Sequence, residues 1–152
     1  MGVSQVISFN YGAGNHLELK SLLRKSLVLV CISGLVVIAL AEATASWVAE
    51  VYVGYDEALR DLTAHATRVY MASFLIAGFN MFASAWFTAL NNGLVSAIAA
   101  FVRTFIFELV CVFVLPLIWG VEGIWLSVNV AEVLALILSF ALIVTFRKRY
   151  GY

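Results

Sequence analysis

Residues 27–41, LVLVCISGLVVIALA, contain no charged side chain and no proline. A helix needs about 20 mainly apolar residues to cross the hydrocarbon core of a bilayer. With its flanking residues, the first such segment covers 22–41, and three more follow at about 68–90, 94–118 and 123–146. This pattern predicts an all-α, polytopic membrane protein with four transmembrane helices, in a single unit without a linker.

The composition agrees with a membrane protein. Hydrophobic residues make up 64% of the 152 residues, charged residues make up 12%, and the mean hydropathy is +1.02. Soluble domains have about 45–50% and about 25% of these two classes. The formal net charge is zero and the Lys and Arg residues lie singly or in short groups, so nothing indicates a nucleic-acid partner.

A short apolar segment, residues 2–12, precedes the turn formed by Gly12, Ala13 and Gly14. As a helix it would be about 17 Å long, roughly half the thickness of the hydrocarbon core. It lacks the basic start and the cleavage site of a signal peptide. We expect this N-terminal half-helix to be the end of a membrane helix from a longer parent, which coding sequence for further spans upstream of Met1 would support.

Residues 43–65 contain too many charges for a membrane span. Trp47, Val48, Val51 and Tyr55 recur there at helical spacing, which predicts a short amphipathic segment at the membrane interface.

Basic residues flank the set of four spans. Lys20, Arg24 and Lys25 lie at the start of the first span, and residues 147–149 (Arg-Lys-Arg) follow the last span. Four spans separate the two groups, so both fall on one side of the membrane. The positive-inside rule predicts a multi-pass protein of the cell membrane with a cytoplasmic C-terminus.

The segment 68–90 carries a stripe of polar side chains. Ser73, Asn80, Ser84 and Thr88 lie within roughly 80° of one another around a helix. Such a stripe must face another helix or water, because lipid cannot form hydrogen bonds with it. Two roles fit equally well: the lining of a substrate cavity, or hydrogen bonding between packed helices. Asn80 is the most costly of the four to expose to lipid, which makes it the principal candidate.

Ionisable groups lie inside the last two spans. Arg103 and Glu108 are five positions apart, about 140° around an α-helix, and are poor partners for each other. For Arg103 we predict a structural role, as an anchor to the cytoplasmic surface or as a contact to a neighbouring helix. Glu108 fits proton coupling, an interhelical contact or a position on the substrate cavity. Asn129 and Glu132 share a helical face, for which we predict helix packing.

Signatures of catalysis and of metal binding are missing from the sequence. There is no Walker loop and no His/Glu zinc motif, and Cys31 and Cys111 lie in separate apolar segments. His16 and His65 fall in loops on opposite sides of the membrane. We therefore expect neither an enzyme nor a metal site.

Four stretches of the chain resemble MATE (multidrug and toxic compound extrusion) transporters. In the family's order, they resemble the end of helix 8, part of helix 10, the start of helix 11 and the start of helix 12. The stretches are residues 2–20 (GVSQVISFNYGAGNHLELK), 80–93 (NMFASAWFTALNNG), 100–107 (AFVRTFIF) and 120–134 (GVEGIWLSVNVAEVL).

The resemblance implies a partial second lobe of a twelve-helix, two-lobed fold. MATE transporters export amphiphilic or cationic compounds by alternating access driven by sodium or protons. The implied partners are the lipid bilayer, the substrate and the missing N-terminal lobe, without which we expect no transport. The residues implied to face the substrate cavity are Ser73, Asn80, Ser84, Thr88 and Glu108.

The coupling ion stays unassigned between sodium and protons. Some family members carry a cation-coupling Asp in the tenth helix, and Asn80 lies near that position. An asparagine can ligate a cation through its carbonyl oxygen but cannot take up a proton.

Two alternatives differ in function. A flippase for lipid-linked sugars, from a related branch, would have a strongly basic cavity, and Arg103 is the one basic residue available for it. A small oligomeric structural membrane protein would function without further chain, and the half-helix over residues 2–12 argues against it.

Overall fold

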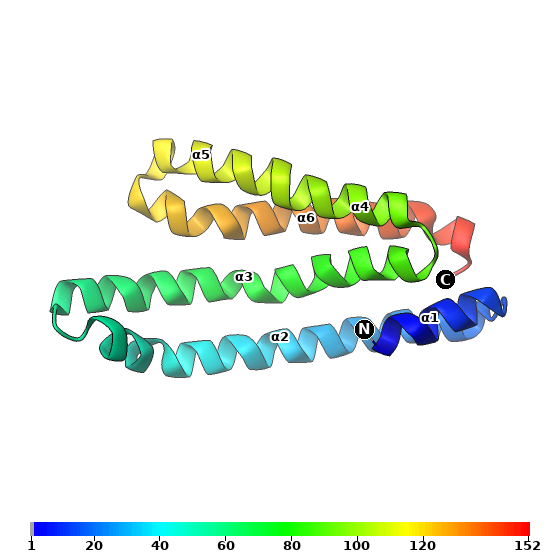
Figure 1. Ribbon diagram of the computed structural model, residues 1–152, viewed down its shortest axis with the longest axis horizontal. Coiled ribbons are helices and arrows are strands. Elements are labelled where there is room, and N and C mark those ends of the chain that lie inside the picture. Colours follow the sequence, from blue (N-terminus) through cyan, green and yellow to red (C-terminus); the bar gives the residue numbers. More distant parts are fainter. Residues whose placement is uncertain (1) are drawn as a thin grey trace.

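The computed structural model describes residues 2–152, and this part of the chain is helical almost throughout (Figure 1). The predicted all-α class is confirmed, and four helical runs are long and apolar enough to cross a membrane. The elements are α1 (Gly2–Gly12), α2 (His16–Val53), α3 (Glu57–Ala89), α4 (Gly93–Phe101), the π-helix η1 (Val102–Phe107), α5 (Glu108–Trp119) and α6 (Val121–Tyr150). Elements α4, η1 and α5 follow one another without a break and form one continuous run.

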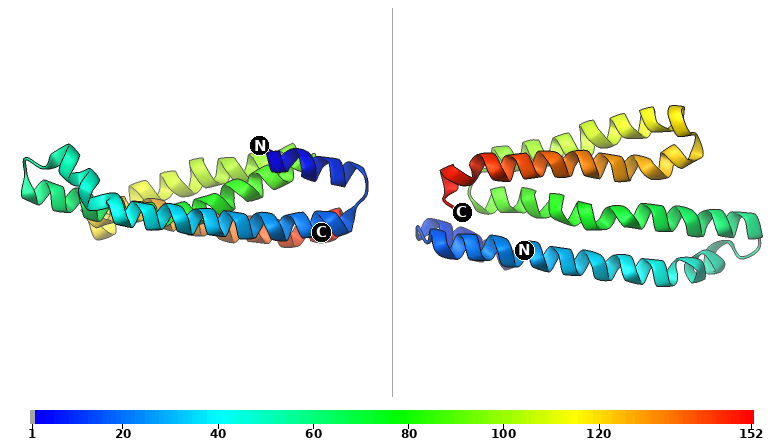
Figure 2. Two further views of the ribbon diagram at one scale, coloured as in Figure 1. Left: turned by 90° about the horizontal axis from the view of Figure 1, so that it is seen from below. Right: turned by 180° about the vertical axis from the view of Figure 1, so that it is seen from behind.

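Two antiparallel helical hairpins lie side by side. Helices α2 and α3 form the first hairpin, and the α4–α5 run and α6 form the second (Figures 1 and 2). Helix α6 packs against both α3 and α5, so the order across the molecule is α2, α3, α6, α5. Helix α1 folds back along α2 and α3.

The first long helix extends well beyond the predicted span. Helix α2 has 38 residues, which at 1.5 Å per residue is about 57 Å, nearly twice the hydrocarbon thickness. It begins at His16 because the Asn15 side chain caps it, accepting a hydrogen bond from the Glu18 N–H at 3.2 Å. Gly14, with φ +68°, makes the turn out of α1.

The structure differs from the prediction over residues 43–65. No separate amphipathic helix covers this range; α2 continues to Val53, a turn follows, and α3 begins at Glu57. The Asp56 side chain caps α3 by accepting from the Leu59 N–H at 3.1 Å. The charges that interrupt the apolar pattern instead link the two helices, for example through Arg68 and Glu42, whose Nε and Oε2 atoms lie 3.4 Å apart. These ends of α2 and α3 extend beyond the turn between α5 and α6 (Figure 1).

The third membrane run departs from a regular α-helix at its centre. Residues 102–107 form a π-helical segment, in which the Glu108 N–H donates to the Arg103 carbonyl five residues back. Hydropathy alone predicts one helix over 94–118, because a local change of helical pitch leaves the apolar run unaltered. π-Helical segments often accompany functional sites.

The largest buried cluster lies at the end of the bundle where α2 begins and α6 ends. Ile7 of α1, Trp86 and Phe87 of α3, and Tyr150 of α6 are almost fully buried there. The Ser8 hydroxyl also donates to the Ala89 carbonyl at 2.8 Å. The N-terminal half-helix α1 is therefore packed against α3 and the rest of the bundle.

The turn between α5 and α6 depends on a glycine at position 123. A Cβ atom there would clash with the Leu115 carbonyl oxygen and lie 2.8 Å from the Pro116 nitrogen, both of which belong to the backbone. Gly93 follows the turn between α3 and α4. A Cβ atom added to it would have no other atom within 4 Å.

We expect Gly123→Ala to lower the free energy of unfolding by about 1–3 kcal/mol, because the backbones of α5 and α6 must separate to admit the methyl group. Unfolding of the detergent-solubilised chain by sodium dodecyl sulfate measures the change. The matched control, Gly93→Ala, should alter it by less than about 0.5 kcal/mol. Equal effects of the two substitutions would contradict the close approach.

Candidate functional site

A buried ion pair joins α6 to the π-helical segment. Arg103 Nη2 donates to Glu132 Oε1 at 2.6 Å, and Arg103 Nε lies 3.0 and 3.1 Å from the two carboxylate oxygens. The Glu132 side chain is 9% exposed and that of Arg103 is 20% exposed. Of the two roles predicted for Arg103, the contact to a neighbouring helix is the one the structure shows, and its partner is Glu132 rather than Glu108.

Asn80 of α3 completes this network. Its Nδ2 donates to Glu132 Oε2 at 2.7 Å and to the Glu132 carbonyl at 3.0 Å. Its Oδ1 accepts a hydrogen bond from the Ser139 hydroxyl at 2.9 Å. The four side chains come from α3, η1 and α6, so one polar network ties three helical elements together. We call Asn80, Arg103, Glu132 and Ser139 the Arg–Glu network.

A second polar cluster links α3 to α4. The Ser84 and Ser96 hydroxyl oxygens are 2.8 Å apart, and the Thr88 hydroxyl donates to the Ser96 hydroxyl at 2.7 Å. Ser96 also donates to the Ser84 carbonyl at 2.8 Å. Ser84 and Thr88, two residues of the predicted stripe, therefore bond to α4 across the turn that joins it to α3. Hydrogen bonding between helices was one of the two roles predicted for the stripe.

The two clusters border one groove. Its volume is about 330 Å³, and it lies between α3, the α4–η1 run and α6. We call it the polar groove; its lining residues are Asn80, Met81, Ser84, Ala85, Thr88, Ala99, Ala100, Arg103 and Ser139. The structure thus brings three of the predicted cavity candidates, Asn80, Ser84 and Thr88, to one surface. Arg103, predicted only as a structural residue, joins them.

Two predicted cavity residues do not line this groove. Ser73 is 2% exposed, and its hydroxyl donates to the Tyr70 carbonyl of its own helix at 2.7 Å. Glu108 is half-buried, at the first position of α5. Within residues 2–152 its side chain makes no ion pair shorter than 4 Å.

Asn129 serves helix packing. Its Nδ2 donates to the Val69 carbonyl of α3 at 2.9 Å and to the Trp125 carbonyl at 3.3 Å. Glu132, predicted with it as a packing residue, has the ionic role described above in addition to its position between helices.

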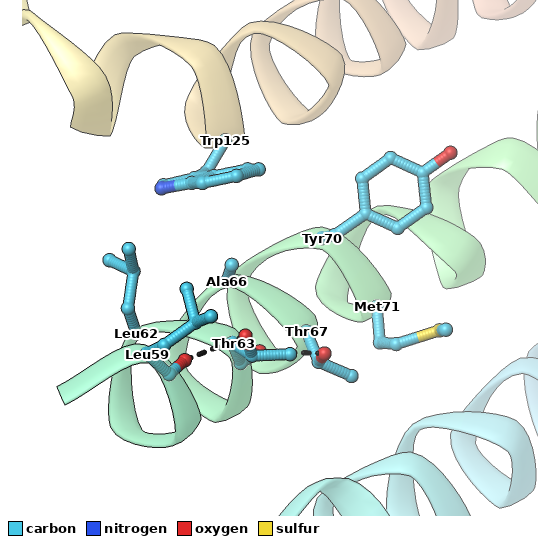
Figure 3. Close-up of a pocket in the computed structure, with 8 residues that line it drawn as sticks. All are labelled: Leu59, Leu62, Thr63, Ala66, Thr67, Tyr70, Met71 and Trp125. Carbon is cyan, nitrogen blue, oxygen red and sulfur yellow. Dashed lines mark hydrogen bonds between the residues drawn. The ribbon is translucent and has the colours of Figure 1, made fainter. Parts of the chain in front are cut away.

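An apolar groove of about 390 Å³ lies further along α3, opposite Trp125 of α6 (Figure 3). The Thr63 and Thr67 hydroxyls each donate to the carbonyl four residues back, so they add little polarity to this surface. Leu62 and Ala66 line it on the side that faces the indole ring. It offers an apolar wall and an aromatic face, without a charged side chain.

Sequence reasoning missed Ser96 and the pairing of Arg103 with Glu132. The sequence does contain a signal for Ser96. The turn at Asn91–Gly93 brings the end of one helix alongside the start of the next, so residues at equal distances before and after the turn, such as Thr88 and Ser96, lie opposite one another. No sequence signal pairs Arg103 with Glu132, which are 29 positions apart and lie on different helices.

The fold and the groove define a polytopic helical membrane protein with a polar site between its helices. The sequence profile of the MatE family matches residues 1–114. The chain belongs to the MatE family, whose members are membrane transporters rather than enzymes. The predicted resemblance is therefore confirmed.

A solved structure shows the same fold. It is described as the inward-facing conformation of a multidrug resistance MATE family transporter of the MOP superfamily, with a TM-score of 0.84 and 22% sequence identity. The match covers 98% of this chain and 34% of that transporter, so the chain spans about a third of it. No curated protein sequence matches the chain.

Removing one partner of the ion pair should be costly. We expect Glu132→Ala to lower the free energy of unfolding by about 3–5 kcal/mol, because it leaves the Arg103 guanidinium buried without a counter-charge. The double variant Arg103→Met/Glu132→Leu should recover most of this loss, since no buried charge remains. Unfolding in detergent measures the free energy of unfolding of the single and the double variants. If the loss in the double variant equalled the sum of the losses caused by each substitution alone, a direct ion pair would be contradicted.

Proposed function

We propose that this chain is the C-terminal part of a multidrug efflux antiporter. The parent exports amphiphilic, cationic compounds by cation-coupled alternating access, and the chain alone does not transport. The observation that carries the proposal is the polar groove, which lies within membrane-spanning helices of a chain that belongs to the MatE family. Family membership favours this function over a structural role for a small oligomer.

The chemistry of the polar groove suits such a substrate. Its one cation, Arg103, is neutralised by Glu132, so the groove presents no uncompensated positive charge. The oxygens of Asn80, Ser84 and Thr88 are neutral acceptors, which tolerate a cationic substrate. The apolar lining at Met81, Ala85 and Ala99 suits its hydrophobic part. A strongly basic cavity, expected of a lipid-linked-sugar flippase, is not formed by the residues that line this groove.

The partial length of the chain supports the need for a second lobe. Alternating access of this kind moves two repeats around a shared site, and this chain supplies one side of that site. Sodium or protons would drive the cycle in the parent. Glu108 is the carboxyl group in the spans without a close cationic partner among the described residues, and we assign it to the substrate cavity of the assembled transporter.

The sidedness is part of the proposal. Six of the nine Lys and Arg residues lie at the end of the bundle where α2 begins and α6 ends, namely Lys20, Arg24, Lys25 and residues 147–149. At the opposite turns acidic residues outnumber the cations, and Arg60 and Arg68 are paired with them there. We place the basic end in the cytoplasm and the ends of α2 and α3 that replace the predicted segment 43–65 at the opposite interface. We assign the spans predicted at 22–41, 68–90, 94–118 and 123–146 to α2, α3, the α4–α5 run and α6, of which α3 ends at Ala89.

Export of a fluorescent lipophilic cation from cells tests the function. We expect no export by the 152-residue chain and active export when a MATE first lobe and the missing helices are joined to it. Export by the short chain would refute its inactivity. A correctly inserted, joined protein that moves no cation would refute the assigned function.

The role of the polar groove is tested in the joined protein. We expect Thr88→Val to raise the KM for export about fivefold, because one neutral hydrogen-bonding group is lost from the groove. The matched control is Thr67→Val on the same helix, whose hydroxyl bonds within its own helix outside the polar groove. This control should leave the KM unchanged. Equal effects of the two substitutions on the KM would contradict a role of the polar groove in substrate binding.

Fusion reporters test the sidedness. Green fluorescent protein attached after Tyr152 should fluoresce, because it folds in the cytoplasm, whereas alkaline phosphatase at the same place should be inactive. A phosphatase inserted between Tyr55 and Asp56 should be active. The reverse pattern would overturn the proposed orientation.

A further inference from the structure

A third groove lies at the basic end of the bundle, between α2 and α6. Its volume is about 460 Å³. It is separate from the polar groove, with which it shares no lining residue. Figure 1 shows the start of α2 and the end of α6 at the same end of the molecule.

The lining of this groove changes from charged to apolar along both helices. Lys20 and Arg24 lie in the first turns of α2, and Arg147 lies near the end of α6. Towards the middle of the bundle the lining becomes apolar, with Val28 on α2 and Val144 on α6. The groove is therefore amphipathic, with its cations near the membrane surface and its apolar part at the depth of the acyl chains.

Two of the three cations that line this groove are not neutralised by the described chain. Lys20 and Arg24 make no ion pair there, and no acidic side chain lines the groove. The one acidic residue near this end, Glu18, lies 3.6 Å from Lys25 Nζ. Arg147 is the exception, because its Nε donates at 3.1 Å to the main-chain oxygen of Tyr152, where the 152-residue chain carries its C-terminal carboxylate. Burial raises the pKa of the Tyr152 hydroxyl to about 12, so this side chain adds no negative charge.

We propose that this groove binds an anionic phospholipid of the phosphatidylglycerol type. The headgroup phosphate contacts Lys20 and Arg24, and an acyl chain lies along Val28 and Val144. Lys and Arg side chains bind phosphate oxygens through charge-assisted hydrogen bonds. Basic pockets between membrane helices are suited to anionic headgroups, and the apolar part of the groove would have no function for a free phosphate ion. This binding goes beyond the transport proposed above and does not depend on it.

Lipid retention by the purified 152-residue chain tests the charged part of the groove, formed by Lys20 and Arg24. The detergent-solubilised chain is mixed with phosphatidylglycerol or phosphatidylcholine of identical acyl chains, and bound lipid is counted by native mass spectrometry. We expect selective retention of phosphatidylglycerol, reduced about fivefold by Arg24→Gln and again by Lys20→Gln. The control Lys148→Gln removes an exposed charge at the same end, outside the groove, and should leave retention unchanged.

The apolar part separates a lipid site from a phosphate site. Val144→Trp fills the groove without changing its charge and should abolish selective retention. Val133→Trp, at a similarly exposed position on α6 that does not line the groove, should not. Equal retention of both lipids, an equal loss with Lys148→Gln, or displacement of the lipid by millimolar inorganic phosphate would overturn the proposal.

Crosslinking in intact membranes tests the same site without purification, so its result does not depend on how well a variant survives in detergent. Photoreactive phosphatidylglycerol in membranes that contain the full chain should crosslink to peptides that include residues 20–28 or 140–147. Crosslinks spread evenly over the lipid-facing helices would overturn a defined site. Crosslinks between two copies of the chain at these residues would show that a second copy occupies the groove instead.

Discussion

The ion pair between Arg103 and Glu132 is the interaction on which the packing of this helical bundle depends. A charge inside a membrane protein is costly unless a partner satisfies it, and here the partner sits on another helix. Asn80 donates to the same carboxylate, so α3, η1 and α6 are held at one point. Rotation of any of these elements about its axis would leave a charge or an amide without its partner.

The same network shapes the groove beside it. Arg103 belongs to the π-helical segment, where the local pitch sets the direction from which its guanidinium approaches Glu132. Because the pair is internally neutral, the polar groove presents hydroxyl and amide groups rather than a net charge. Because its hydrogen bonds join three elements, the network fixes the orientations of α3, η1 and α6 relative to one another.

The two ends of the bundle differ in chemistry. Aromatic residues and α1 close the basic end, where Trp86, Phe87 and Tyr150 are buried together, while unpaired cations remain at its surface. At the other end, Arg60 and Arg68 bond to acidic residues of α2 and close the hairpin. The basic end can therefore attract anionic lipid, whereas the acidic end satisfies much of its charge internally. This asymmetry also carries the proposed orientation in the membrane.

The sequence by itself determined the class of the protein, the approximate positions of the four spans and the polar stripe that includes Asn80, Ser84 and Thr88, because hydropathy and helical periodicity are local properties. It could not determine that residues 43–65 belong to two long helices, since polar residues beyond the hydrocarbon core can stay helical. Nor could it determine which residue neutralises Arg103. Periodicity sets the angle of a side chain about its own helix, but the rotation of one helix relative to another is decided only when the helices pack. The tertiary structure alone therefore brought Arg103, Glu132 and Asn80 together.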